Sequence, residues 1–229
     1  CLAYLAINDP TLMVGMPPSL TAATGMDALT HAVEAYTCRE ATPYTDALAI
    51  EAIRLVGRSL RRAVADGCDM QARTDMCWAE YMAGLAFSNA GLGLGHSIAH
   101  QLGAQYHIPH GAACAQILPR VMEYNIPACL ERMGDIASAL GADIRGLSAQ
   151  EAAQAAADCV RDLSEDIGIR PLHSYGFSMD DIPLLARHAM EDTCTPSNPV
   201  DAVEGEVARI IAKTYCEGLV VEAVRQQGF

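Results

Sequence analysis

The 229-residue chain is 51% hydrophobic and only 19% charged, a composition that favours a globular protein and argues against global disorder. Its formal net charge is −13, with Lys213 the single lysine among fifteen basic residues, so it lacks the basic stripe typical of a nucleic-acid-binding surface. No apolar run reaches transmembrane length, and no basic segment precedes the apolar opening as in a signal peptide. We therefore expect neither nucleic acid nor a membrane as a partner.

The nine cysteines indicate the compartment. They are odd in number, never spaced as CxxC, and stand mostly among apolar neighbours, at positions 1, 38, 68, 77, 114, 129, 159, 194 and 216. Free cysteines in such surroundings pack as small hydrophobic residues, whereas a disulfide framework belongs to secreted chains. The pattern predicts a reducing, cytoplasmic environment.

The opening residues 1–7, CLAYLAI, are typical of a β-strand and are followed by the turn Asn8-Asp9-Pro10. Strand-like alternation is almost absent after this point, so the segment has no evident partner strand. We expect residues 1–18 to be a remnant strand and linker from a missing N-terminal unit, and 19–229 to be one helical domain. The alternative is a frayed terminus of a complete protein.

The rest of the chain predicts an all-α helical bundle. The first expected helix covers PSLTAATGMDALTHAVEAYT, with Ser19 or Thr21 as its N-cap. The third is apolar almost all round and is expected to be buried, with Trp78 and Tyr81 in its core. The helix after Ser148 opens with the capping-box pattern SAQE. After the first, the helices are expected at about 43–65, 70–89, 91–106, 111–124, 128–140, 148–167, 180–190 and 202–226, with the loop DTCTPSNPV before the last.

Two pairs of polar residues share the spacing i, i+4, which stacks side chains on one helix face. Asp27 and His31 stand among apolar residues in GMDALTHAVEAY, so the pair forms either a plain ion pair or part of a site that shares a cation. His96 and His100 repeat the spacing in GHSIAH, behind glycines that let a ligand or backbone approach closely. The histidines could instead fill the core.

His110 follows in IPHG, where proline and glycine define a turn, whereas His107 precedes the break and is expected to be a bystander. Taken together, one carboxylate and three imidazoles from two helices and a turn make an N₃O set suited to Fe(II) or Zn(II). Such a set leaves positions open for water or a substrate oxygen. The residues thus predict a metalloenzyme without naming its reaction.

Three segments together resemble the iron-containing (group III) alcohol dehydrogenases: PPSLTAATGMDALTHAVEAY, NAGLGLGHSIAHQLGAQYHIPHGAACAQILPRVMEYN and DDIPLLARHAMEDTCTPSNP. They occur in family order and span essentially the whole chain. The resemblance implies that the metal ligands are Asp27, His31, His96 and His110. It also implies that His100 faces the nicotinamide and substrate, where it assists a proton relay without binding the metal.

The resemblance further implies the helical C-terminal domain of a dehydroquinate synthase-like fold, which in the family follows a dinucleotide-binding domain. No strand–glycine-rich loop–helix unit occurs in these residues, so NAD or NADP would be bound mainly by that missing domain. We expect a homo-oligomer, such as a dimer, that acts on a small alcohol or aldehyde. The domain alone should bind metal, transfer hydride poorly and expose an apolar face.

Alternatives within the superfamily are a hydroxyacid–oxoacid transhydrogenase and a polyol dehydrogenase. Two further alternatives are not metal-dependent enzymes: a non-catalytic helical interaction module, and a relative that keeps the fold but has lost its metal. Val200 departs from the basic residue that relatives often carry after NP, so Asn198 receives no role. Glu34 is expected to be an ordinary surface carboxylate rather than a partner of His31. His173 and His188 are expected away from the cluster.

Overall fold

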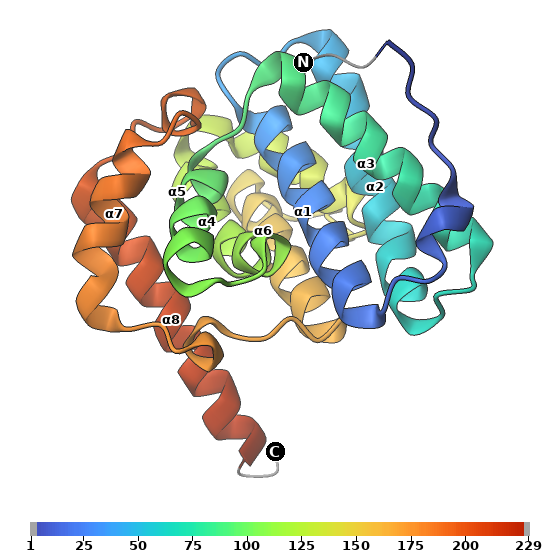
Figure 1. Cartoon of the computed structure of the whole chain (residues 1–229). Helices are drawn as coiled ribbons and strands as arrows, with labels where there is room; N and C mark the ends of the chain where they lie inside the picture. Colours follow the sequence, from blue (N-terminus) through green and yellow to red (C-terminus); the bar gives the residue numbers. More distant parts are fainter. Residues whose placement is uncertain (1–3, 227–229) are drawn as a thin grey trace.

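The computed structural model describes residues 4–226. Within them the chain forms α-helices joined by short 3₁₀ turns and contains no strand (Figure 1), so the expected all-α bundle is confirmed. The helices are α1 (Pro18–Thr37), α2 (Pro43–Ala65), α3 (Met70–Ala90), α4 (Leu94–Tyr106), α5 (His110–Ala139), α6 (Ala149–Asp166), α7 (Ile182–Glu191) and α8 (Glu204–Gln226). The 3₁₀ turns are η1 (Pro10–Met13), η2 (Leu172–Tyr175), η3 (Met179–Asp181) and η4 (Thr195–Ser197).

The predicted strand at 1–7 is wrong for the residues that can be judged. Residues 4–9 form no strand, and Tyr4, Leu5 and Ile7 are exposed. A strand gains its stability from hydrogen bonds to a neighbour, and the described part of the chain offers no other strand to pair with. Residues 1–3 of the prediction lie outside the described residues.

Two helices begin with a side-chain capping box, and a third begins at a proline. Ser148 and Glu151 form the predicted capping box at the start of α6. A second capping box, between Thr42 and Thr45, begins α2. The predicted N-cap of α1 at Ser19 or Thr21 is wrong, because the helix begins at Pro18, whose preset φ and missing N–H suit a first helical position.

The two helices expected at 111–124 and 128–140 form the single element α5, which is interrupted by one residue. Cys129 leaves helical geometry with φ −142° and ψ 40°, two residues after Pro127. A proline inside a helix removes a backbone hydrogen bond and kinks the axis. Two helical segments therefore meet at a kink here, as the sequence predicted, and the label α5 covers both.

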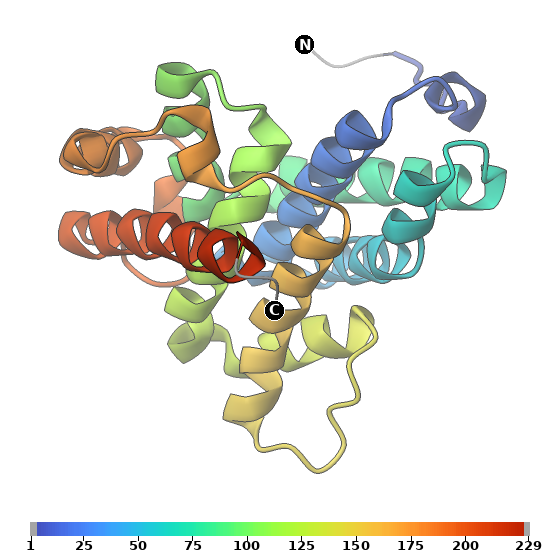
Figure 2. The same cartoon turned by 90° about the horizontal axis from the view of Figure 1, so that it is seen from below.

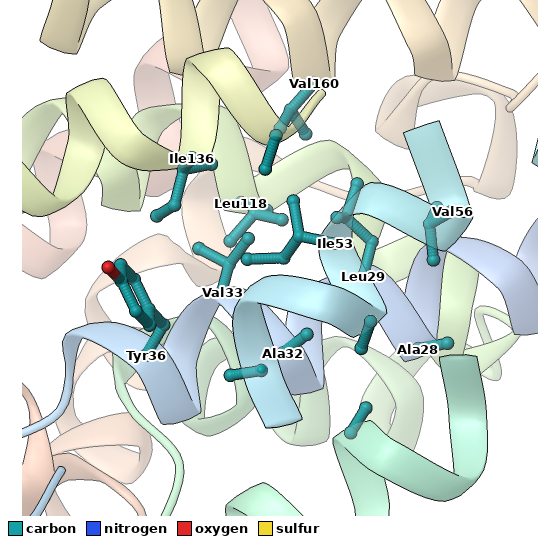
Figure 3. Packing of buried hydrophobic residues seen from close by; sticks show 14 of the residues in the cluster. Ala28, Leu29, Ala32, Val33, Tyr36, Ile53, Val56, Leu118, Ile136 and Val160 are labelled. Atoms are coloured by element: carbon teal, nitrogen blue, oxygen red, sulfur yellow. The ribbon is translucent and has the colours of Figure 1, made fainter. Parts of the chain in front are cut away.

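Two hydrophobic clusters hold the helices together, and α5 contributes to both. Figure 3 shows the larger cluster, where Leu29 and Val33 of α1 meet Ile53 of α2, Leu118 and Ile136 of α5, and Val160 of α6. The smaller cluster joins α4 and α5 to α7 and α8, so that α7 and α8 lie on one side of α5, and α2 and α3 on the other (Figure 2). Helices α1, α4 and α5 meet between the two clusters.

Helix α3 departs from its prediction as a buried element. Its inner face consists largely of alanines, including Ala72, Ala79 and Ala83, while Trp78 and Tyr81 are 51% and 40% exposed. Small residues let α3 pack closely on α1 and α2, while Trp78 and Tyr81 point away from the core. The expectation that Trp78 and Tyr81 serve the core is wrong. In the part of the chain that is described, no helix combines the length and the hydropathy needed to cross a bilayer.

Candidate metal centre

Helices α1, α4 and α5 lie next to one another (Figure 1), and each contributes polar donor atoms to one group. Asp27 lies in α1, His96 in α4, and His110 is the first residue of α5. From Asp27 Oδ1 the distance is 3.3 Å to His110 Nε2 and 3.6 Å to His96 Nε2. His31 Nε2, one turn along α1, lies 3.8 Å from the same oxygen.

The meeting of α1 and α5 depends on Gly111. A Cβ at this position would lie 1.9 Å from the carbonyl oxygen of Ala23 and 3.2 Å from Asp27 Cβ, a separation that backbone atoms do not tolerate. Only a residue without a side chain lets the start of α5 contact α1 so closely. The glycine therefore brings His110, its neighbour, within reach of Asp27.

Glu34 contradicts its sequence interpretation, because it is 4% exposed and lies inside the centre. Its carboxylate accepts hydrogen bonds from the backbone N–H groups of Gly93, at 3.0 Å, and Gly95, at 2.6 Å. The first N–H groups of a helix have no partner within it and favour negative charge, so Glu34 of α1 caps α4. The glycines make room for this carboxylate, since a Cβ on Gly95 would lie 2.7 Å from Glu34 Oε1.

The same carboxylate also orients His96, with 2.6 Å between Glu34 Oε2 and His96 Nδ1. Burial opposes ionisation of Glu34, but the His96 imidazole and the two glycine N–H groups outweigh it and lower its pKa. An ionised Glu34 requires a proton on Nδ1. When the ring is neutral, its Nε2 lone pair then faces Asp27.

Two atoms of the centre that the protein leaves unsatisfied fit a shared cation. Asp27 Oδ1 and His96 Nε2 are buried and have no hydrogen-bond partner, although unpaired buried polar atoms are costly. For bonds of about 2.0–2.1 Å, neighbouring ligands of a tetrahedral ion lie about 3.3–3.4 Å apart. The distances of 3.3 and 3.6 Å from Asp27 are close to this value. The residues therefore fit a shared divalent ion.

Electrostatics favour an ionised Asp27. Burial acts to raise its pKa, but the imidazoles of His110, His96 and His31 outweigh that effect and hold the pKa below its ordinary value. Asp27 thus supplies the negative charge that a buried divalent ion needs.

The metal ligands predicted from the sequence do not all lie equally close to one another. One group of donor atoms, all within 4.8 Å of one another, belongs to Asp27, His96, His110 and Cys114. His31 stands at the edge, its ring stacked on Phe87 at 4.5 Å and on His96 at 4.7 Å. Sequence reasoning missed Cys114, although it follows His110 at the i, i+4 spacing that marked Asp27 and His31.

His100 lies beside the cluster and outside this group of donors. Its ring stacks on that of His110 at 5.5 Å, and its Nδ1 lies 2.9 Å from Asp192 Oδ2. Burial opposes ionisation of Asp192, but the Cys194 backbone N–H and His100 lower its pKa. Asp192 was not anticipated from the sequence, where nothing distinguished it from other loop carboxylates. His107 is exposed and ends α4 in the left-handed region, with φ 54°.

Asn198, to which the sequence assigned no role, is 1% exposed and connects the η4 loop to the centre. Its Oδ1 accepts from the backbone N–H of Leu94, which completes the capping of α4 begun by Glu34. Its amide also exchanges hydrogen bonds with that of Asn125 on α5. His188 is exposed on α7, as predicted. His173 lies in η2, beyond the donor cluster.

These features define a helical domain that brings together imidazole, carboxylate and thiol groups, of which His96 and Cys114 are buried. A family-wide sequence model described as the Fe-containing alcohol dehydrogenase family, C-terminal, matches residues 21–215. The chain belongs to this family.

Individual relatives agree with the assignment. The chain is 49% identical to the 1,3-propanediol dehydrogenase of Klebsiella pneumoniae over 93% of its own length and 56% of that protein. It is 47% identical to the NAD-dependent methanol dehydrogenase of Bacillus methanolicus, over 90% of this chain and 55% of the relative. A crystal structure of a 1,3-propanediol oxidoreductase superposes with a TM-score of 0.89 at 50% identity, covering 90% of this chain and 54% of that one. The chain thus spans about half the length of the relatives it matches.

Proposed function

We propose that this chain is the metal-holding part of an NAD(P)-dependent alcohol dehydrogenase that interconverts small alcohols and aldehydes. The main observation behind this proposal is a pair of unsatisfied buried atoms, Asp27 Oδ1 and His96 Nε2, which face each other across 3.6 Å. A catalytic ion explains why the protein maintains them. The names of the relatives, among them a 1,3-propanediol dehydrogenase and an NAD-dependent methanol dehydrogenase, support the reaction class.

Asp27, His31, His96 and His110 are the proposed ligands, with Fe(II) as the proposed ion and Zn(II) the alternative. When bound, such an ion acts as a Lewis acid that stabilises negative charge developing on the substrate oxygen. Glu34 holds His96 with Nε2 toward the ion. His110, 40% exposed, marks the side of the centre that opens to solvent and hence to substrate.

His100 is the proposed proton carrier. It is 42% exposed, contacts the ring of His110, and is held by Asp192 through Nδ1. This arrangement leaves Nε2 to exchange a proton between the substrate hydroxyl and solvent. We further propose that a separate dinucleotide-binding domain holds the nicotinamide and that the natural protein is a cytoplasmic homodimer.

Metal analysis tests the proposal. After anaerobic loading with Fe(II) or Zn(II) and removal of excess ion, the chain should retain about one ion per molecule. The Asp27→Ala variant should lose it. Asp162→Ala, which removes an exposed carboxylate from α6, should retain it. A chain that holds no ion would instead favour the helical interaction module or the metal-free relative.

Substrate measurements on the natural protein would define the reaction. NADH formation from 1,3-propanediol and from methanol, compared with longer polyols and hydroxyacids, distinguishes an alcohol dehydrogenase from a polyol dehydrogenase or a transhydrogenase. A transhydrogenase would require an oxoacid acceptor in place of free NAD. His100→Gln should lower kcat while the ion remains bound.

A further inference from the structure

Cys114 is a buried nucleophilic group that the proposed mechanism does not use. It lies one turn after His110 on α5 and is fully buried. Its Sγ is 3.6 Å from His110 Nε2, the nitrogen proposed to face the ion. A cysteine in a core usually packs as a small hydrophobic residue, so its surroundings decide whether it does more.

The surroundings of Cys114 are polar and incompletely satisfied. Its sulfur belongs to the group of donor atoms within 4.8 Å of one another, together with Asp27, His96 and His110. In the same group, His96 Nε2 belongs to a side chain that is 1% exposed and lacks a hydrogen-bond partner. The thiol therefore faces the point at which unsatisfied donors converge.

The separation agrees with that of two ligands on a common ion. With zinc–sulfur bonds of about 2.3 Å and zinc–nitrogen bonds of about 2.0–2.1 Å, tetrahedral geometry places sulfur and nitrogen about 3.5–3.6 Å apart. The observed distance between Cys114 Sγ and His110 Nε2 is 3.6 Å. By the same measure His31 is the more distant candidate, at 3.8 Å from Asp27 Oδ1 where about 3.3–3.4 Å is expected.

We propose that Cys114 is a metal ligand of this centre, so that the donor set contains sulfur as well as nitrogen and oxygen. On binding, the S–H bond breaks, the proton passes to solvent, and the sulfur lone pair forms the bond to the ion. No electron is transferred. Without an ion the thiol stays protonated, because burial, with the carboxylates of Asp27 and Glu34, raises its pKa well above the ordinary value.

A thiolate changes the metal that the centre prefers. Imidazole and carboxylate accommodate both Fe(II) and Zn(II), whereas a soft sulfur donor favours zinc. The chain should therefore bind zinc more tightly than its N₃O residues alone would. Cobalt(II), a spectroscopic substitute for zinc, should also bind, and its absorption spectrum should then show a sulfur-to-cobalt charge-transfer band. This inference rests on the metal centre proposed above.

The test is cobalt(II) titration of the complete chain, followed by near-ultraviolet absorption and by equilibrium dialysis. The wild type should bind cobalt and develop the band. Cys114→Ala should lose the band and bind zinc more weakly. The loss should be at least as large as the about 10- to 100-fold that follows removal of a residue that only hydrogen-bonds to a metal ligand. Cys129→Ala removes another buried cysteine from the same helix and should behave as the wild type.

The outcomes separate the two proposals. Cobalt bound without the band, or a band that persists in Cys114→Ala, overturns the sulfur ligand and leaves the metal centre intact. A wild-type chain that binds no cobalt overturns both. X-ray absorption of the zinc-loaded chain gives a second measurement that does not depend on a variant folding, since a sulfur ligand appears at about 2.3 Å. A shell of nitrogen and oxygen alone contradicts the inference.

Discussion

Glu34 of α1 and His96 of α4 lie 2.6 Å apart, carboxylate oxygen to ring nitrogen, with 4% and 1% of their surfaces exposed. The pair joins two functions in one contact. Glu34 satisfies the N–H groups that begin α4, and it determines which nitrogen of His96 faces the proposed ion. Fold and chemistry therefore depend on the same carboxylate.

Replacing Glu34 by glutamine tests this dual role. Glutamine has the same shape but one acceptor in place of two, so it cannot bind both glycine N–H groups and also accept from His96 Nδ1. We expect Glu34→Gln to weaken zinc binding by about 10- to 100-fold, as measured by competition with a chromophoric chelator. Glu40→Gln changes an exposed carboxylate beyond the end of α1 and should have no effect. Equal affinity in Glu34→Gln and wild type would contradict the orienting role.

The dependence of metal binding on pH follows from the same pair. Burial alone would lower the pKa of His96, but the Glu34 carboxylate, together with Asp27, raises it to about 9. In the metal-free chain a proton therefore occupies the position that the ion needs. As the pH rises toward about 9, that proton is lost more readily, so its release alone should increase zinc affinity by up to about tenfold per pH unit.

The contribution of His96 should level off above its pKa, whereas displacement of the Cys114 thiol proton would continue to raise the affinity; the variant Cys114→Ala isolates the His96 contribution. Zinc competition assays over this range measure the slope, and proton release can be followed in weakly buffered solution. In Glu34→Gln, where the carboxylate no longer raises the pKa, the plateau should begin at lower pH. An affinity that does not change between about pH 7 and 9 would mean that His96 is already neutral before the ion binds.

The sequence predicted what depends on local spacing. The i, i+4 pairs identified Asp27 and His96, and hydrophobic periodicity located the helices. The roles of Glu34, Asp192 and Asn198 were not predicted, because they depend on contacts between segments about sixty to one hundred residues apart. A carboxylate on a helix has the same sequence pattern whether it faces solvent or caps another helix. The exposure of Trp78 likewise depended on which face of α3 packs inward.

Gly111→Ala should damage the centre through the backbone. The added methyl would lie 1.9 Å from Ala23 O, so α1 and α5 must separate and Asp27 must move from His110. Overpacking of this kind costs about 1–3 kcal/mol, a fall in Tm of about 2–4 °C per kcal/mol in a chain of this size. Zinc affinity should fall as well. Gly84→Ala is the matched control, because a Cβ there meets nothing within 4 Å.

In an open helical position such as Gly84, alanine is more favourable than glycine by up to about 1 kcal/mol. Gly84→Ala should therefore leave the thermal midpoint unchanged or raise it. Thermal unfolding followed by circular dichroism compares the two variants directly. If Gly111→Ala were as stable and bound zinc as tightly as Gly84→Ala, close contact between α1 and α5 would not be what positions Asp27 and His110.

Asn198 tests whether the η4 loop supports the centre. Alanine at this position leaves the backbone N–H of Leu94 and the Asn125 amide without their partner, and both are buried. Unsatisfied buried groups cost about 1–3 kcal/mol, so denaturant unfolding of Asn198→Ala should show a lower midpoint. Asn89→Ala, which removes an exposed amide from α3, should stay near the wild type. Because each single variant leaves the other amide without its partner, the double variant Asn125→Ala/Asn198→Ala should be less destabilised than the sum of the two; strict additivity would show that the two amides act independently.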